Sequence, residues 1–288
     1  MPNHWLAFDL EAAGDLREAL NDLGGRAIAI YYPLVIAPKV MEYSAVGRRL
    51  RGSLQELEEQ HGLDALWLRV SGFGSMDATA RMLLRYVHFA RAMHEAGVPI
   101  IAERSGTLGL ALLAFGVVGG IEQGVTFGEG FDANTLTKDK GSSSGFMPAP
   151  RIYLAEIGAF VKKSEAERLF ADRSAKNRFA CQRPCCKRGV SDMIHDPRRH
   201  FLACRADEIG GISRVPTGMR ADHYLETWLR PASDRVGVAA KVLPRLIKHR
   251  RRLEDYRAAL SDLRMVDKLE QPSISEIPTG GRLHRWGV

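Results

Sequence analysis

The stretch "VPIIAERSG" at residues 98–106 decides which fold this sequence predicts. Its apolar first half predicts a buried strand, which ends at Glu103 and Arg104. Ser105 and Gly106 then predict a tight turn into a helix, whose first N–H groups could face an anion. A buried strand that delivers an acid and a base to the start of a helix is typical of parallel βα units.

The pattern of an apolar strand followed by a helix recurs on both sides of this stretch. Further strands are predicted at residues 4–10, 26–36, 65–72, 116–129 and 151–161, and helices at residues 15–23, 38–60, 77–95, 107–115 and 164–174. Near-continuous hydrophobic strands separated by helices predict an α/β fold with a parallel sheet. Six or seven such strands favour a TIM-barrel-like fold, complete or irregular, because a full barrel has about eight and a doubly wound open sheet fewer.

The second half of the chain has a different character. Residues 132–150 are polar and rich in Gly, Ser and Pro, which predicts a long loop. Residues 179–220 show little periodicity, whereas residues 221–231 and 233–264 predict helices, the second with a kink at Pro244. We therefore expect a barrel-like domain at residues 1–178, a metal-binding and basic helical region at 179–265, and an irregular tail at 266–288.

The charge of the chain is unevenly distributed around its net value of +7. Residues 1–150 contain 13 Lys and Arg against 17 Asp and Glu, whereas residues 151–288 contain 28 against 17. A basic half indicates a polyanionic partner such as nucleic acid, with a solvated basic surface as the alternative. Within it, "KVLPRLIKHRRRLEDYR" at residues 241–257 predicts a basic helix that could follow a phosphate backbone.

Hydrophobicity and the N-terminal residues bear on location. No apolar stretch reaches the roughly 18 residues that a membrane-spanning helix needs. Residues 1–15 lack the basic region and apolar core of a signal peptide. We therefore expect no membrane partner and a cytoplasmic location, where thiols stay reduced and clustered cysteines indicate metal binding or catalysis before disulfides.

The stretch "FACQRPCCKRG" at residues 179–189 contains three of the four cysteines of the chain. A structural zinc site needs four nitrogen or sulfur ligands at the corners of a tetrahedron. We predict that Cys181, Cys185, Cys186 and His223 hold a structural zinc ion.

Other interpretations of this cluster stay open. Cys204 or His200 could replace one of the predicted ligands, because two adjacent cysteines share one ion only in a tight geometry. A redox or nucleophilic thiol is a second possibility, since Arg183, Lys187 and Arg188 would lower a thiol pKa. The thiols could also have no ligand at all.

A barrel-like series of strands, the cysteine cluster and the later helix "HYLETWLR" at residues 223–230 together resemble the tRNA-guanine transglycosylase superfamily. The zinc motif of that family is C-x-C-x-x-C followed by His. Cys181 and Cys186 match its outer cysteines, the middle one is displaced to Cys185, and the gap before His223 is longer. The resemblance implies a structural zinc, exchange of a guanine-type base in tRNA or DNA, and an aspartate nucleophile with a second acid near the base.

Catalytic candidates follow from position, because the active site of a parallel barrel lies at the carboxyl ends of its strands. We take Asp9, Glu103, Arg104 and Asp132 as the catalytic candidates. Carboxylates suit glycosyl transfer because one stabilises an oxocarbenium-like carbon while another moves a proton. Further polar residues at predicted strand ends or at the start of the long loop are Arg69, Ser71, Glu122, Gln123 and Glu129. An ion pair that only closes the strand end is the alternative interpretation of Glu103 and Arg104.

The sequence thus predicts an enzyme that exchanges a guanine-type base in nucleic acid. The first alternative is a non-catalytic, zinc-stabilised nucleic-acid-binding protein on a degenerate barrel. The second is a barrel enzyme that binds a small anionic metabolite at the turn of residues 103–106.

Overall fold

The structure is a computed structural model of the 288-residue chain. It describes residues 3–25, 27–42, 45–61, 64–74, 78–95, 97–124, 130–133 and 151–270. Most of the predicted loop at residues 132–150, the tail beyond residue 270 and the candidate Glu129 lie outside the described residues.

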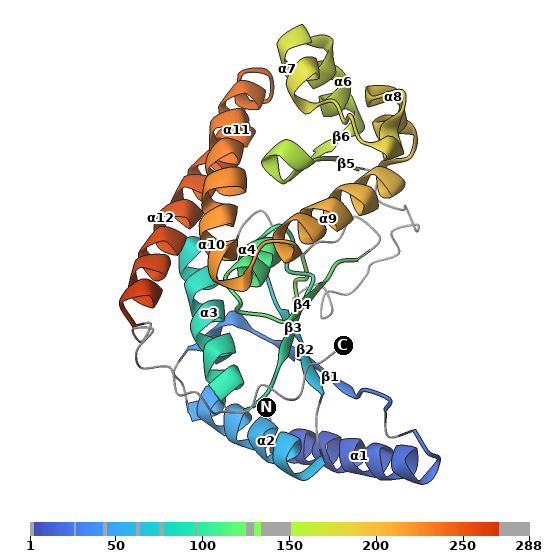
Figure 1. Cartoon of the computed structure of the whole chain (residues 1–288), viewed down its shortest axis with the longest axis vertical. Helices are drawn as coiled ribbons and strands as arrows, with labels where there is room; N and C mark the ends of the chain where they lie inside the picture. The colour runs from blue at the N-terminus through green and yellow to red at the C-terminus, as the bar shows by residue number, and fades with distance from the viewer. Residues whose placement is uncertain are drawn as a thin grey trace, which may run out of the picture.

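A parallel sheet lies at the centre of the fold (Figure 1). Its strands are β1 (Tyr31–Ile36), β2 (Ala65–Val70), β3 (Ile100–Glu103) and β4 (Gly120–Glu122), hydrogen-bonded side by side in that order. All three pairings are parallel. The sequential order means that each strand is followed by a connection to its immediate neighbour, as in barrel-type βα units.

The connections between these strands are helical, as the sequence predicts. They are η1 (Pro38–Met41) and α2 (Ala45–His61) after β1, α3 (Ala80–Glu95) after β2, and α4 (Leu108–Ala114) after β3. The core between sheet and helices is fully buried at Leu54, Leu66, Leu83 and Ile100. Burial of these apolar side chains is the main force that holds the helices on the sheet.

The first predicted strand is wrong. Residues 4–10 belong to the helix α1 (Asn3–Asp22), which continues through the predicted helix of residues 15–23 almost to its end. The apolar run is short, and the Ala-, Glu- and Leu-rich residues that follow it favour a helix. α1 packs against α2 beside the sheet and adds no strand to it.

The predicted strand at residues 151–161 is a hairpin. β5 (Arg151–Leu154) and β6 (Ala159–Lys162) pair antiparallel across the short turn η2 (Ala155–Ile157). Gly158 closes the turn with a φ of +60°, a conformation that glycine adopts without strain. A Cβ atom at Gly158 would lie 2.9 Å from Cη2 of Trp228, so the turn also needs glycine for its packing.

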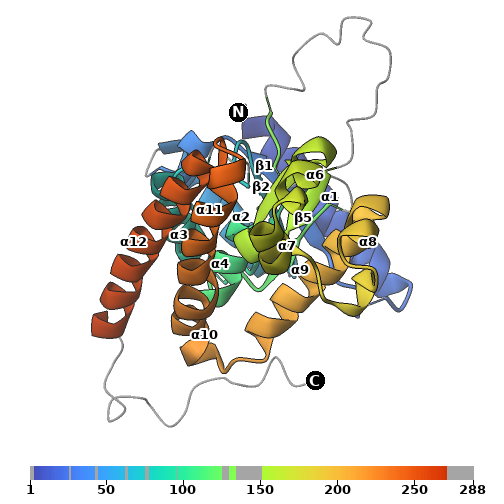
Figure 2. The same ribbon diagram turned by 90° about the horizontal axis from the view of Figure 1, so that it is seen from above.

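Helices build the region around the cysteines. They are α6 (Lys163–Ala171), α7 (Arg173–Phe179), the turn η3 (Pro184–Cys186), α8 (Val190–His195) and α9 (Pro197–Ser213). The predicted irregular region of residues 179–220 therefore contains a long helix. β5 and α4 both pack against α9, so α9 links the hairpin to the central sheet (Figures 1 and 2).

The last helices form a hairpin along one side of the molecule. α10 (Thr217–His223) passes through the π-helical turn η4 (Tyr224–Leu229) into α11 (Arg230–Val242), and α12 (Leu246–Glu270) returns beside it (Figure 1). Pro231, predicted to end a helix, lies in the first turn of α11 directly after the π-helical turn, and the helix continues through it. Pro244 does more than kink the predicted helix, because the chain reverses there.

The α/β class is confirmed, whereas the TIM-barrel-like fold is not. In the described part of the chain the parallel sheet has four strands with β1 and β4 at its edges. The hairpin of residues 151–162 forms a separate two-stranded sheet. It packs on α9 of the cysteine region, although the predicted boundary at residue 178 places it with the first domain.

Candidate metal centre and sheet edge

Three thiols converge in the loop between α7 and α8. Cys181 follows α7 directly, and Cys185 and Cys186 lie in η3, where the Cys186 N–H donates to the Arg183 carbonyl oxygen at 2.9 Å. The Sγ atoms of Cys181 and Cys185 are 3.9 Å apart, and those of Cys185 and Cys186 are 3.7 Å apart. The tight turn at Pro184 therefore brings adjacent cysteines to one point.

His200 supplies the fourth donor atom of the cluster. It lies in the first turn of α9, which begins at Pro197 and is capped by Asp196 through a 3.0 Å bond from the Arg199 N–H. His200 Nδ1 is 3.3 Å from Cys186 Sγ, while Nε2 lies 2.8 Å from the Tyr153 carbonyl oxygen. A carbonyl accepts only, so Nε2 carries the proton and Nδ1 keeps its lone pair for the thiol side.

The cluster fits a tetrahedral metal ion. The donor atoms of Cys181, Cys185, Cys186 and His200 all lie within 4.8 Å of one another and could hold a metal ion. Metal–sulfur bonds of about 2.3 Å in tetrahedral geometry separate neighbouring sulfur atoms by about 3.8 Å, which matches the two measured separations. The hydrogen bond from His200 to Tyr153 is the kind of outer contact that orients a metal-bound imidazole.

His223 is not part of this cluster, so His200 replaces it in the predicted set. His223 ends α10 and is exposed. Its carbonyl oxygen accepts a 2.7 Å bond from the Thr227 hydroxyl group. The three predicted cysteines are brought together, and the structure selects His200 from the alternatives that the sequence left open.

The fourth cysteine, Cys204, borders the cluster without belonging to it. It lies one helical turn after His200 in α9 and is completely buried. Its Sγ atom is 3.6 Å from His200 Nδ1 and accepts a 3.5 Å bond from Arg183 Nη1. Cys204 therefore packs behind the imidazole ring and against Arg183.

Burial raises the pKa of the Cys185, Cys186 and Cys204 thiols. It lowers the pKa of His200, so the cluster favours a neutral imidazole. A nucleophilic thiol requires a lowered pKa, which makes these three thiols poor nucleophiles despite their basic neighbours. A bound cation would reverse the preference, since metal ions coordinate thiolates.

A pocket opens beside the cluster. Its volume is about 400 Å³, and its walls include Cys181, His200, Arg178 and Glu156. A small chelator could reach the cluster from this side.

A second polar group lies at the carboxyl edge of the sheet. Arg69, Glu103 and Glu122 occupy equivalent positions on β2, β3 and β4, because Arg69 pairs with Glu103 and Glu103 with Glu122 in the strand register. Arg69 forms an ion pair with Glu103. Burial lowers the pKa of Arg69, the charge of Arg104 lowers it further, and Glu122 opposes both effects. The sheet thus aligns one guanidinium group and two carboxylates in a row, with Glu103 in the middle.

Several buried polar atoms at this edge have no hydrogen-bond partner within the described residues. They are Arg69 Nε, Ser105 Oγ, Glu122 Oε2 and Gln123 Oε1. Ser105 is completely buried, and the amide nitrogen of Gln123 donates to the Gly106 carbonyl oxygen at 2.9 Å. Buried polar groups normally find partners, so water, an ion, a ligand or residues outside the described ranges could complete these atoms.

The turn after β3 has an unusual backbone. Arg104 has a φ of 48°, the one positive value among the described non-glycine residues. Strain of this kind persists only where the surroundings hold it, and it is common at functional sites. Gly106 follows with a φ of +58°, and a Cβ atom there would lie 2.5 Å from the Gly74 carbonyl oxygen.

Asp132 belongs to the same edge. The Phe131 carbonyl oxygen before it accepts a 2.6 Å bond from Gly72, and the Ala133 N–H after it donates to Ser71 Oγ at 2.9 Å. The Arg69 guanidinium group lies over the Phe131 ring, 5.1 Å from its centroid. The exposed Asp132 is thereby held beside the end of β2.

Asp9 lies at the other end of the sheet. It accepts a 2.9 Å hydrogen bond from the hydroxyl group of Tyr32, the second residue of β1. This is the amino end of the strand, because β1 ends at Ile36. The prediction that Asp9 ends a strand is wrong, and its carboxylate does not join the group at the carboxyl edge.

No family model, curated protein or solved structure matches the chain. The resemblance to the tRNA-guanine transglycosylase superfamily therefore remains a prediction from the sequence. Among the described residues, no helix combines the length and apolarity needed to cross a bilayer.

Proposed function

We propose that the protein exchanges a guanine-type base in tRNA or DNA at the carboxyl edge of its parallel sheet. The observation that carries the proposal is the row of Arg69, Glu103 and Glu122 beside the unpaired atoms of Ser105 and Gln123. The edge of a guanine ring presents N–H donors, which carboxylate and amide oxygens accept.

The reaction requires two acidic groups with different tasks. One carboxylate stabilises or attacks the sugar carbon as the bond to the base breaks, and the other gives a proton to the leaving base. The incoming base returns that proton when the new bond forms, so the exchange balances. Glu103, Glu122 and Asp132 are the carboxylates available at this edge, and Arg104 and Arg69 are the cations that could hold a neighbouring phosphate.

The Cys and His cluster has a structural role in this proposal, with zinc as the ion. Four protein ligands leave no open position for water or substrate, which is typical of structural zinc sites. The ion would fasten the loop of residues 181–186 to α9, and through His200 and Tyr153 to β5. Reduced thiols and a thiolate-bound ion suit the cytoplasmic location that we also propose.

The test is incorporation of labelled guanine into tRNA and into duplex DNA by the purified, metal-loaded chain. Glu103→Gln and Glu122→Gln should each abolish most incorporation. Asp9→Asn is the matched control, since Asp9 lies at the opposite end of the sheet and its variant should retain activity. Incorporation by the wild type that survives in both Glu variants would overturn the assignment of the site.

A non-catalytic nucleic-acid-binding protein is the second candidate. The ion pair with Arg69 favours it, because an acid held by a half-buried guanidinium group is a poorer nucleophile and a weaker proton acceptor. Binding of nucleic acid without any incorporation of guanine would support this candidate over the enzyme.

A further inference from the structure

A basic corner lies where α12 begins beside β6 and α6. We use this name for five residues: Lys162, Arg245, Lys248, Arg251 and Arg252. Arg245 ties the elements together, since its Nη2 atom donates to the Phe160 carbonyl oxygen at 3.2 Å and to Glu165 Oε2 at 2.7 Å.

The helix geometry directs several of these cations to one side. Lys248, Arg251 and Arg252 are three and four residues apart on α12, so they are neighbours on its surface. The opposite side of the helix is buried at Leu246, His249 and Leu253. Lys162, Lys248 and Arg251 are exposed, whereas Arg252 is half-buried. The corner therefore presents positive charge to solvent.

Carboxylates of the described residues balance part of this charge, since the neighbouring Arg250 pairs with Glu254 at 3.0 Å. Glu165 is bound by Arg245, and the hydrogen bond from Arg245 is the main cause of its lowered pKa. Asp255 is exposed one turn after Arg251. The charges of Arg252 and Arg245 also contribute, after burial, to the lowered pKa of His249. Like charges crowd at this corner, which favours an anionic partner.

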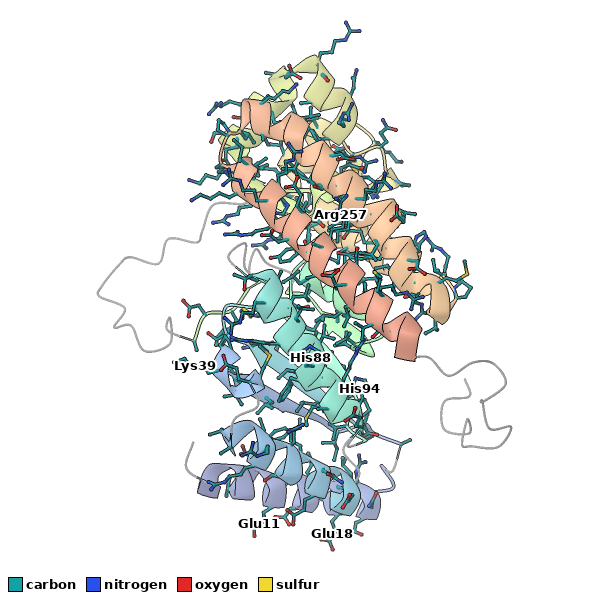
Figure 3. The ribbon with its side chains drawn as sticks, turned by 90° about the vertical axis from the view of Figure 1, so that its left-hand side faces the viewer. Glu11, Glu18, Lys39, His88, His94 and Arg257 are labelled. Atoms are coloured by element: carbon teal, nitrogen blue, oxygen red, sulfur yellow. The ribbon has the colours of Figure 1, made fainter. Side chains whose placement is uncertain are left out.

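The opposite end of the molecule is acidic. Glu11 and Glu18 project outward from α1, far from the helix pair of α11 and α12, where many nitrogen-tipped side chains project near the upper end (Figure 3). The exposed Asp22 adds to the acids of α1. This separation of charge orients the molecule so that the basic corner meets a polyanion first.

The rings of Phe160 and Trp228, which line a pocket with Arg252, are half-buried rather than exposed. The exposed aromatic residues of the described chain are Phe8 and Tyr31, on α1 and β1. Proteins that hold single strands stack bases on aromatic side chains, whereas a duplex backbone is held by cations alone. The one large apolar side chain exposed in the first turns of α12 is Ile247.

We propose that the basic corner binds the phosphate backbone of a nucleic-acid duplex. The inference rests on the proposed function only in taking nucleic acid as the partner, and it does not require base exchange. The corner positions the chain on the duplex without reading its sequence, because phosphate contacts are the same at every base pair.

The test is binding of labelled duplexes of about 20 base pairs, in DNA and RNA forms, and of the single strand, across a range of salt. The double variant Lys248→Gln/Arg251→Gln removes two exposed cations. Each phosphate contact contributes about fivefold to affinity at about 0.15 M salt, so the double variant should bind about twenty-fivefold more weakly. Its plot of log affinity against log salt should be shallower by about 1.8.

Arg48→Gln/Arg49→Gln is the matched control, with the same charge change on α2, which packs against α1 at the acidic end; both arginines are exposed. It should retain the affinity and salt slope of the wild type. Melting temperature and metal content are measured for both variants, so that a folding defect is recognised. If the double variant at the corner is misfolded, the single variant Lys248→Gln takes its place. Equal losses in the two double variants, or tighter binding of the single strand than of either duplex, would overturn the proposal. Duplex binding without guanine incorporation would leave it standing and refute the enzyme.

Discussion

Replacing His200 with alanine tests the assignment of the fourth ligand. The side chain is only 1% exposed, and its removal takes away the 2.8 Å hydrogen bond to the Tyr153 carbonyl oxygen. Removing one partner of a buried hydrogen bond costs about 1–3 kcal/mol, and the cavity adds roughly 2 kcal/mol. The free energy of unfolding should therefore fall by about 3–5 kcal/mol even before metal loss is counted. In a chain of this size each kcal/mol lowers the melting temperature by about 2–4 °C, so a decrease of about 6–20 °C is expected.

The assay combines metal analysis of the purified chain with thermal unfolding. Wild type should contain about one metal ion per chain, and His200→Ala far less. His223→Ala is the control, because an exposed substitution should change stability by no more than about 0.5 kcal/mol and leave the metal in place. Cys204→Ala should keep the metal but lose stability, since its side chain is buried. Metal retained in His200→Ala and lost in His223→Ala would refute the reasoning.

Three further predictions concern the sheet edge and the helical region. Glu122→Gln should reduce guanine incorporation by about 10²–10⁴-fold, which is the usual contribution of an acid–base group. The melting temperature is measured in parallel, and unchanged incorporation would remove Glu122 from the site. Gly106→Ala should destabilise the chain by about 2–5 kcal/mol, because Gly106 has a positive φ and lies close to the Gly74 carbonyl oxygen. Gly116 has a φ of +63° but no atom within 4 Å of an added Cβ, so Gly116→Ala should cost only about 1–2 kcal/mol. Equal losses of stability for the two variants in denaturant unfolding would contradict this. Burial lowers the pKa of His249, so the unfolded chain binds the proton more readily than the folded chain. The stability that His249 contributes is therefore present above about pH 6.5 and is lost as pH falls below that value. In unfolding experiments across this range, the free energy of unfolding of His249→Gln should decrease less than that of the wild type.

The strands β2 and β3 could be predicted because apolar residues dominate their runs. Residues 65–72 and 98–106 contain β2 and β3, and their ends bring Arg69 and Glu103 together as expected for parallel strands. The run at residues 4–10 is apolar too, but it is the start of α1. A short apolar run fits a buried helix as well as a strand, and only tertiary packing distinguishes them.

The cysteine site was predictable in its thiols but not in its imidazole. Three cysteines within six residues must lie close together, whatever the fold. Which histidine reaches them depends on how α9 lies on β5, and no local pattern contains that information. A usable signal was present at the start of α9, where Asp196 and Pro197 are a typical N-cap and first helical residue. That signal places His200 in the first turn of a helix that begins 11 residues after Cys186.

The central claim is a metal ion held by three sulfur atoms and one imidazole nitrogen. X-ray absorption at the metal edge of the purified chain measures this coordination directly. We expect zinc with three sulfur neighbours at about 2.3 Å and one nitrogen neighbour at about 2.0 Å, and loss of the nitrogen shell in His200→Ala. A purified chain without metal, or an ion surrounded by four sulfur atoms, would contradict the account.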